Sequence, residues 1–168
     1  MQVSYSAESV LDSTISRNDL RVLLVYPNTR DVAMANLGFQ QVYSLLNKIE
    51  GVVCDRFAMP VGWKPETQSL NREELRSMDM QMHPLDFDVI AFSISFEPDY
   101  LNTVLALKYF GIPLDREERD ASFPMITAGG SAIFINPEPL AECMDVQFIG
   151  EGEGMAENFF GLLRKDLD

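Results

Sequence analysis

The sequence predicts an α/β fold: a five-stranded parallel sheet of order 2-1-3-4-5, with helices on both faces. Short and nearly continuous apolar runs alternate along the chain with segments of helical periodicity. Such runs are typical of strands buried on both faces, and the alternation is typical of parallel strands joined by crossover helices. The 168 residues, of which 46% are hydrophobic, suit one compact domain that needs neither disulfides nor a metal to fold.

The first half of the chain predicts two strands and one helix. Residues 21–26 form the first apolar run, which ends at Pro27-Asn28. Asn36 is placed to cap a helix whose apolar residues recur at helical spacing (Val42, Leu45, Leu46 and Ile49), before Gly51 ends it. The second strand is expected at residues 52–57.

The second half predicts three further strands, at residues 87–95, 124–128 and 146–149. Pro98 is placed to open a helix that ends at Gly111. A short helix is expected at 138–143. A closing helix is indicated by apolar residues at helical spacing: Ala156, Phe159, Phe160, Leu163 and Leu167.

Two segments lack a clear periodicity. Residues 1–19 are expected to be a polar N-terminal arm, with the domain occupying 20–168, and residues 61–84 are expected to be irregular. The arm has no basic flank or apolar stretch, so it does not resemble a signal peptide. The longest strongly apolar run, within 89–96, is far shorter than the roughly 20 residues of a membrane-spanning helix.

The charge and cysteine content exclude several classes of function. With 13 Lys and Arg against 26 Asp and Glu, the net charge is −13. This disfavours nucleic acid and anionic membranes as partners, because both need a basic patch. Cys54 and Cys143 have no C-x-x-C spacing, so we expect reduced thiols in a cytoplasmic protein. The single histidine, His83, cannot build a usual zinc site with them, and we assign no metal ligand.

The predicted order is that of a flavodoxin-like sheet, in which ligands bind outside the carboxyl ends of the strands. That rule selects four loops: residues 27–35, 93–99, 128–137 and 150–154. Glycines at a strand end, as in Gly129-Gly130, allow a ligand to approach the backbone, although a tight turn also uses them. Ser93 and Ser95 could bind a ligand or satisfy nearby backbone groups.

The fifth-strand loop, residues 150–154, places three glycines before a helix. Glu151 and Glu153 would repel a phosphate, and no Lys follows as in a P-loop, so a neutral ligand or another domain fits better. Glu153 also suits the positive end of a helix dipole without any ligand. No nucleophile or metal ligand accompanies these carboxylates, so we assign no catalytic residue.

Taken together, the four loops resemble the N-terminal cobalamin-binding domain of cobalamin-dependent radical S-adenosylmethionine (SAM) proteins. The similarity runs from about Arg21 to Phe160. It is strongest at three stretches: 124–130, which ends in Gly-Gly; 136–140, Asn-Pro-Glu-Pro-Leu; and 144–153, which ends in Gly-Glu-Gly-Glu.

The resemblance implies a function and a set of contacts. The domain would lay a corrin ring over the carboxyl ends of its strands, facing a downstream radical SAM domain that holds a [4Fe–4S] cluster and cleaves SAM. This chain has no C-x-x-x-C-x-x-C motif, so by itself it is not expected to be catalytic, and we expect it to be the first part of a longer enzyme. The implied cobalamin contacts are Pro27, Asn28, Thr29, Ser93, Ser95, Phe96, Gly129, Gly130, Ser131, Pro137, Gly150, Glu151, Gly152 and Glu153.

The chain departs from the family in one respect that bears on the chemistry. The D-x-H-x-x-G signature, whose histidine becomes the lower cobalt ligand, is absent from the first loop. We therefore expect bound cobalamin to have no histidine on cobalt. The alternative is a degenerate flavodoxin-like or receiver-like module that acts through partner contacts and binds no cobalamin. The chain lacks the acidic pair and the lysine that a phosphoreceiver needs, which argues against the receiver-like alternative.

Overall fold

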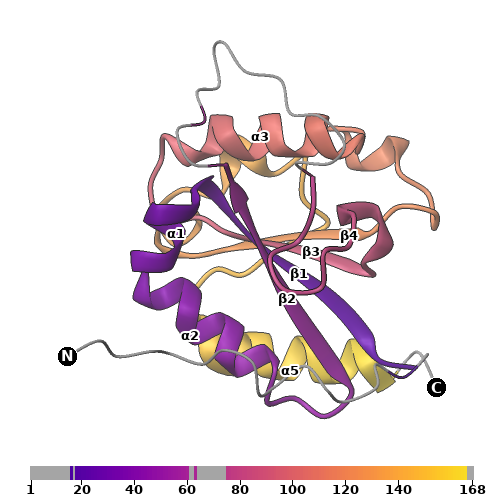
Figure 1. Ribbon diagram of the computed structural model, residues 1–168. Coiled ribbons are helices and arrows are strands. Elements are labelled where there is room, and N and C mark those ends of the chain that lie inside the picture. Colours follow the sequence, from indigo (N-terminus) through magenta and orange to yellow (C-terminus); the bar gives the residue numbers. More distant parts are fainter. Residues whose placement is uncertain (1–15, 17, 61–62, 64–74, 166–168) are drawn as a thin grey trace.

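The computed structural model of the protein describes residues 16, 18–60, 63 and 75–165. It contains the predicted parallel sheet, with strand order β2-β1-β3-β4-β5 (Figure 1). Most of the predicted polar arm, much of the segment 61–84 and Leu167 lie outside the described residues. The strands are β1 (Leu20–Thr29), β2 (Val52–Met59), β3 (Val89–Ser93), β4 (Met125–Gly129) and β5 (Val146–Gln147).

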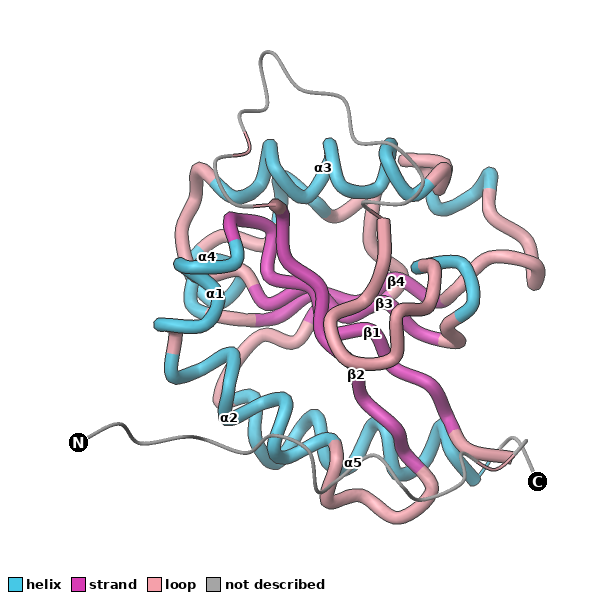
Figure 2. Tube along the Cα trace, viewed as in Figure 1, coloured by secondary structure: helices cyan, strands magenta, loops and turns pink. Residues whose placement is uncertain are grey.

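Helices cover both faces of the sheet (Figures 1 and 2). On one face, α3 (Asp99–Phe110) packs its buried side chains on β1, β3 and β4. On the other face lie α2 (Leu37–Leu46) and α5 (Gly152–Lys165), which contact each other and enclose a second core. Two shorter helices, α1 (Arg30–Ala35) and α4 (Ser131–Ile135), follow β1 and β4 directly.

The alternation of side chains along β1 explains why its apolar run is continuous. Leu23 and Val25 belong to the core under α3, whereas Leu24 and Tyr26 belong to the core under α2 and α5. All four are buried, because the strand lies between two others and is covered on both sides.

The register of the central strands brings small and large side chains into rows across the sheet. Leu24 of β1 lies beside Ala91 of β3, which lies beside Thr127 of β4. One step nearer the carboxyl edge on the same face, Ser93 lies beside Gly129. Neither Ala91 nor Gly129 carries a large side chain. These two residues therefore leave unfilled space above the middle of this face of the sheet.

The structure corrects several predicted boundaries: α2 ends at Leu46 rather than at Gly51, and the strand predicted at 87–95 spans 89–93. The loop predicted at 27–35 is instead the end of β1 followed by α1, and the segment 131–135 is helix α4. The helix predicted at 138–143 is a single 3₁₀ turn, Glu138–Leu140. Strand β5 ends at Gln147, where its pairing with β4 stops, although the Phe148 N–H still donates to the Ala128 carbonyl oxygen at 2.8 Å.

The helix predicted to open near Asn36 is confirmed, and its cap is visible. The Asn36 Oδ1 atom accepts from the Phe39 N–H at 2.9 Å. This contact satisfies one of the N–H groups that the first turn of a helix leaves unpaired. Among the described residues, no helix has the length and apolar character needed to cross a membrane.

Candidate functional site

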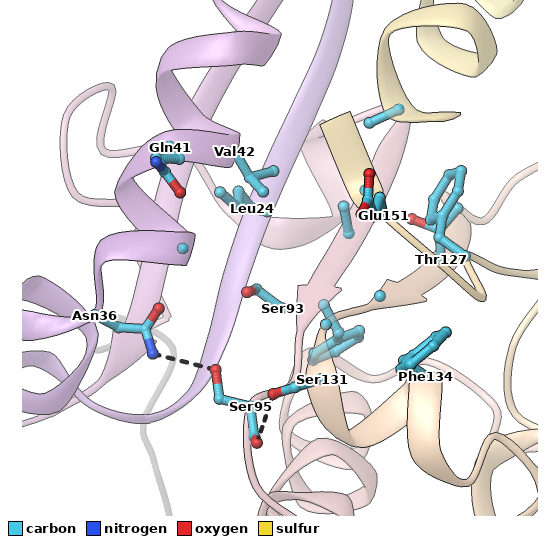
Figure 3. A pocket seen from close by; sticks show the side chains of 18 of the residues that line it. Leu24, Asn36, Gln41, Val42, Ser93, Ser95, Thr127, Ser131, Phe134 and Glu151 are labelled. Carbon is cyan, nitrogen blue, oxygen red and sulfur yellow. Dashed lines mark hydrogen bonds between the residues drawn. The ribbon is translucent and has the colours of Figure 1, made fainter. Parts of the chain in front are cut away.

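A cavity of about 730 Å³ opens at the carboxyl edge of the sheet and descends between α2 and α5 (Figure 3). Its lining combines three strands, three helices and the segments that follow β3 and β5. The lining residues are Leu24, Asn36, Gly38, Gln41, Val42, Leu46, Ala91, Phe92, Ser93, Ser95, Phe96, Thr127, Gly129, Gly130, Ser131, Phe134, Phe148, Gly150, Glu151, Gly152, Ala156 and Phe160. We call this cavity the slot.

The floor of the slot is the row formed by Leu24, Ala91 and Thr127. All three are buried, and Thr127 has no exposed surface at all. The floor is deep because Ala91, the middle residue, has a side chain of one carbon.

Thr127 is the polar residue of this floor. Its Oγ1 atom is buried and has no hydrogen-bond partner among the described residues. A buried hydroxyl without a partner is unfavourable, since folding removes it from water and returns no hydrogen bond.

The walls of the slot are mainly apolar. Val42 and Leu46 of α2 form one side, and Ala156 and Phe160 of α5 form the other. Phe148, which follows β5, joins the α5 wall, and its ring centre lies 6.1 Å from that of Phe160. Such walls suit a flat apolar group.

The mouth of the slot carries neutral polar side chains that hold one another in place. Asn36 Nδ2 donates to Ser95 Oγ at 3.1 Å, and Ser131 Oγ donates to the Ser95 carbonyl oxygen at 3.0 Å (Figure 3). These bonds tie α2, the segment after β3 and α4 into one rim. Ser93 and Gln41 also line the slot near α2 and β3.

The rim also exposes large apolar side chains. Phe96 is 58% exposed and Phe134 is 60% exposed, and both line the slot. Leu37, Ile135 and Ile149 are exposed as well, each within two residues of a residue that lines the slot. Exposed apolar groups gathered around a cavity are typical of a surface that meets a ligand or another domain.

The slot carries little charge. Of the described residues that line it, Glu151 is the only charged one. A nucleotide polyphosphate would meet no Lys or Arg there, which supports the exclusion made from the loop sequence.

Nine of the residues predicted to contact a ligand line the slot: Ser93, Ser95, Phe96, Gly129, Gly130, Ser131, Gly150, Glu151 and Gly152. Glu153 lies in the first turn of α5. Pro27, Asn28, Thr29 and Pro137 are not in the lining. The Pro137 carbonyl oxygen accepts from Gln147 Nε2 at 2.8 Å, which ties the segment after α4 to β5.

Asn28 faces the start of α3 rather than the slot. Its Nδ2 atom donates to Asp99 Oδ1 at 2.9 Å, and Asn102 Nδ2 donates to the same oxygen at 3.1 Å. The Asp99 side chain is buried, and this burial raises the pKa of the carboxyl group above its ordinary value despite both bonds. We therefore assign Asn28 to the junction between β1 and α3.

Gly130 has a structural reason to be glycine. Its φ is +111°, which residues with a side chain rarely adopt, and a Cβ atom there would overlap the Ile94 carbonyl oxygen. The close approach of β4 to the end of β3 thus accounts for this glycine. A Cβ atom on Gly129 would instead lie 3.4 Å from Phe148 Cβ, which is an ordinary van der Waals contact.

The histidine and cysteine side chains that could bind a metal do not line the slot. His83 caps a 3₁₀ helix (Pro84–Asp86) that leads into the amino end of β3, and its Nδ1 atom accepts from the Leu85 N–H at 3.2 Å. Cys54 is buried within β2, and burial raises the pKa of its thiol. The described residues contain no group of three His, Cys, Asp or Glu placed to hold a metal ion.

Sequence reasoning missed the helical and mid-strand residues of the slot. Gly38, Gln41 and Val42 come from α2, and Thr127 lies inside β4 rather than in a loop. Two signals were present: a glycine inside a helix, and a threonine within an otherwise apolar strand. Each is informative only when the neighbours across the sheet are known.

Comparison with known proteins relates the chain to a family. No curated protein and no solved structure matches this chain. A family model described as "Radical SAM proteins, N-terminal" matches residues 38–167, which is most of the chain. Membership implies a radical SAM domain in the parent protein, together with the SAM and the [4Fe–4S] cluster that such a domain uses. This chain belongs to the family of N-terminal domains of radical SAM proteins.

Proposed function

We propose that this domain binds cobalamin at the carboxyl edge of its sheet and presents it to the radical SAM domain of the same parent chain. The observation that carries this proposal is the slot: a deep and largely apolar cavity at that edge, with an unpartnered hydroxyl on its floor. The chemistry that the cofactor supplies when bound is reversible cobalt–carbon bonding.

The shape of the slot suits one part of cobalamin. The cofactor consists of a broad corrin ring and a nucleotide tail that ends in a flat benzimidazole. The space between α2 and α5 is closed by apolar walls, including Val42 and Phe160. It would take the benzimidazole, while the corrin would stay outside, over the rim.

The polarity of the rim also suits the cofactor. The corrin periphery carries neutral amide groups, which bind to hydroxyl and amide side chains and need no cationic cradle. Asn36, Ser93, Ser95 and Ser131 supply such groups around the mouth. Phe96 and Phe134 add exposed rings that can pack against the flat macrocycle or against the facing domain.

The position of the only histidine in the sequence decides whether this chain could supply a histidine ligand to the cobalt. His83 precedes β3, at the opposite edge of the sheet from the mouth of the slot. It cannot reach an atom above the carboxyl ends of the strands. A cobalt held there would receive no histidine from this chain.

The test is direct binding of hydroxocobalamin to the protein expressed with its own radical SAM domain, followed by absorbance and calorimetry. We expect saturable binding. A Gly38→Leu variant should lose it, because Gly38 lines the slot on the exposed side of α2 and its nearest neighbour leaves room for a Cβ. Leucine is also a better helix former than glycine, so the fold should be retained.

A matched control adds the same side chain outside the slot. Gly154→Leu, in the first turn of α5, meets nothing within 4 Å and should leave binding unchanged. Absence of binding by the unaltered protein would contradict the proposal and favour the interaction module that binds no cobalamin. Equal binding by the Gly38→Leu variant would show that the slot is not used.

A further inference from the structure

We propose that Thr127 is a specificity-determining residue, whose hydroxyl donates a hydrogen bond to the ring nitrogen at the tip of the nucleotide base. This inference rests on the proposed function, since it assigns the deepest contact of the same slot. Thr127 places a polar atom in the buried floor of the slot, where the neighbouring side chains of Leu24 and Ala91 are apolar.

Thr127 differs from the other buried hydroxyls that the structure describes. Thr103 donates to the Asp99 carbonyl oxygen at 2.8 Å, and Ser77 Oγ accepts from the Met82 N–H at 2.9 Å. Both are fully buried and both have a partner. Thr127 is equally buried and has none among the described residues.

The position of Thr127 explains why the protein itself offers no partner. Its strand is paired on both sides, with Ala91 of β3 and with Val146 of β5, so the nearby backbone groups bond within the sheet. The neighbouring lining side chains, Leu24, Ala91 and Phe148, carry no polar atom. Valine has a similar branched shape and no hydroxyl, so a group bound in the slot would supply the hydrogen bond that the described residues do not.

The depth of Thr127 defines what that group must look like. The row of Ser93 and Gly129 lies at the mouth, and Thr127 lies two residues below it along β4. At about 3.3 Å per residue, the hydroxyl is roughly 7 Å below the mouth. A fused bicyclic ring spans such a depth, and its far edge must carry an acceptor while its faces are apolar.

Benzimidazole has these properties. One of its ring nitrogens is bonded to the sugar of the tail, and the other has a lone pair at the edge of the ring. An apolar base, or a cofactor without a base, would leave the hydroxyl unpaired. Thr127 therefore selects a base with an acceptor nitrogen.

The experiment compares cobalamin with cobinamide, which has the same corrin and lacks the nucleotide base. Both are titrated by absorbance into the protein with its own radical SAM domain, for the unaltered chain and for Thr127→Val and Thr127→Ser. We expect Thr127→Val to weaken cobalamin binding about tenfold, the effect of one hydrogen bond. Cobinamide binding should not change, and Thr127→Ser should retain cobalamin affinity.

The outcomes separate the inference from the function. Equal cobalamin affinity of Thr127→Val and the unaltered chain would overturn the role of Thr127 and leave cobalamin binding in place. An equal loss for both ligands would also overturn it, because the effect would not lie at the base. Failure of the unaltered chain to bind either ligand would overturn the proposed function and this inference with it.

Discussion

The unpartnered hydroxyl of Thr127 leads to a prediction about stability in the absence of any ligand. Replacing Thr127 by Val keeps the branched shape and removes the buried oxygen that has no hydrogen bond. An unsatisfied buried polar group costs about 1–3 kcal/mol. We therefore expect Thr127→Val to raise the free energy of unfolding by about 1–2 kcal/mol. In a domain of this size, this is a rise in Tm of roughly 2–6 °C.

The matched substitution Thr103→Val should change the free energy of unfolding in the opposite direction. Thr103 is also fully buried, but its hydroxyl donates to the Asp99 carbonyl oxygen. Thr103→Val removes a made hydrogen bond and should lower the free energy of unfolding by about 1 kcal/mol. Both variants are compared with the unaltered chain by urea unfolding, followed by far-UV circular dichroism.

Destabilisation of Thr127→Val by as much as Thr103→Val would refute the reasoning, because it would mean that the hydroxyl of Thr127 is satisfied in the folded protein. The expected result has a further consequence. A residue that lowers the stability of the ligand-free fold and raises affinity is a common compromise in binding sites, since the same polar atom serves only the bound state.

Three further predictions concern the rest of the fold. Gly130→Ala should cost at least about 2 kcal/mol in urea unfolding, because it combines backbone strain with an overlap. Gly111 also has a positive φ, but a Cβ atom there would meet nothing within 4 Å, so Gly111→Ala should lower the free energy of unfolding by less. Equal decreases for the two variants would contradict the predicted overlap of a Gly130 Cβ with the Ile94 carbonyl oxygen. Burial raises the pKa of Asp99, so its contribution to stability falls as the pH rises through that pKa. The stability of Asp99→Asn relative to the unaltered chain should therefore increase between about pH 4 and about pH 7 in urea unfolding, and a constant difference would contradict this. Cys54 should resist alkylation by iodoacetamide in the folded chain, as judged by mass spectrometry, and react after unfolding in urea, because it is buried and its thiolate is disfavoured. Rapid labelling of folded Cys54 would refute that assignment.

The strands were predictable because their signal is local. The run 21–26 is apolar at every position except its first, and the structure buries it on both faces of a central strand. The cap at Asn36 was also readable, since a side chain that bonds to the third residue after it needs no distant partner. The boundaries near 131–135 and 138–143 were not, because short helices there depend on contacts with neighbouring strands.

The candidate site was predictable at its mouth and not at its floor. Ser93, Ser95, Gly129 and Ser131 were found because the ends of parallel strands meet at one edge of the sheet. Asn28 follows the same rule, yet its side chain bonds to Asp99 on the face covered by α3. The direction in which a side chain points at a strand end depends on the register and on the helix packed beside it.

The sequence alone determined the parallel sheet and its strand order, because these follow from the apolar periodicity and from the positions of glycine and proline. The tertiary structure decided that the site is a slot between α2 and α5 with Thr127 at its floor. The physical reason is that depth arises from three residues far apart in sequence, Leu24, Ala91 and Thr127, and only the pairing of their strands sets them side by side.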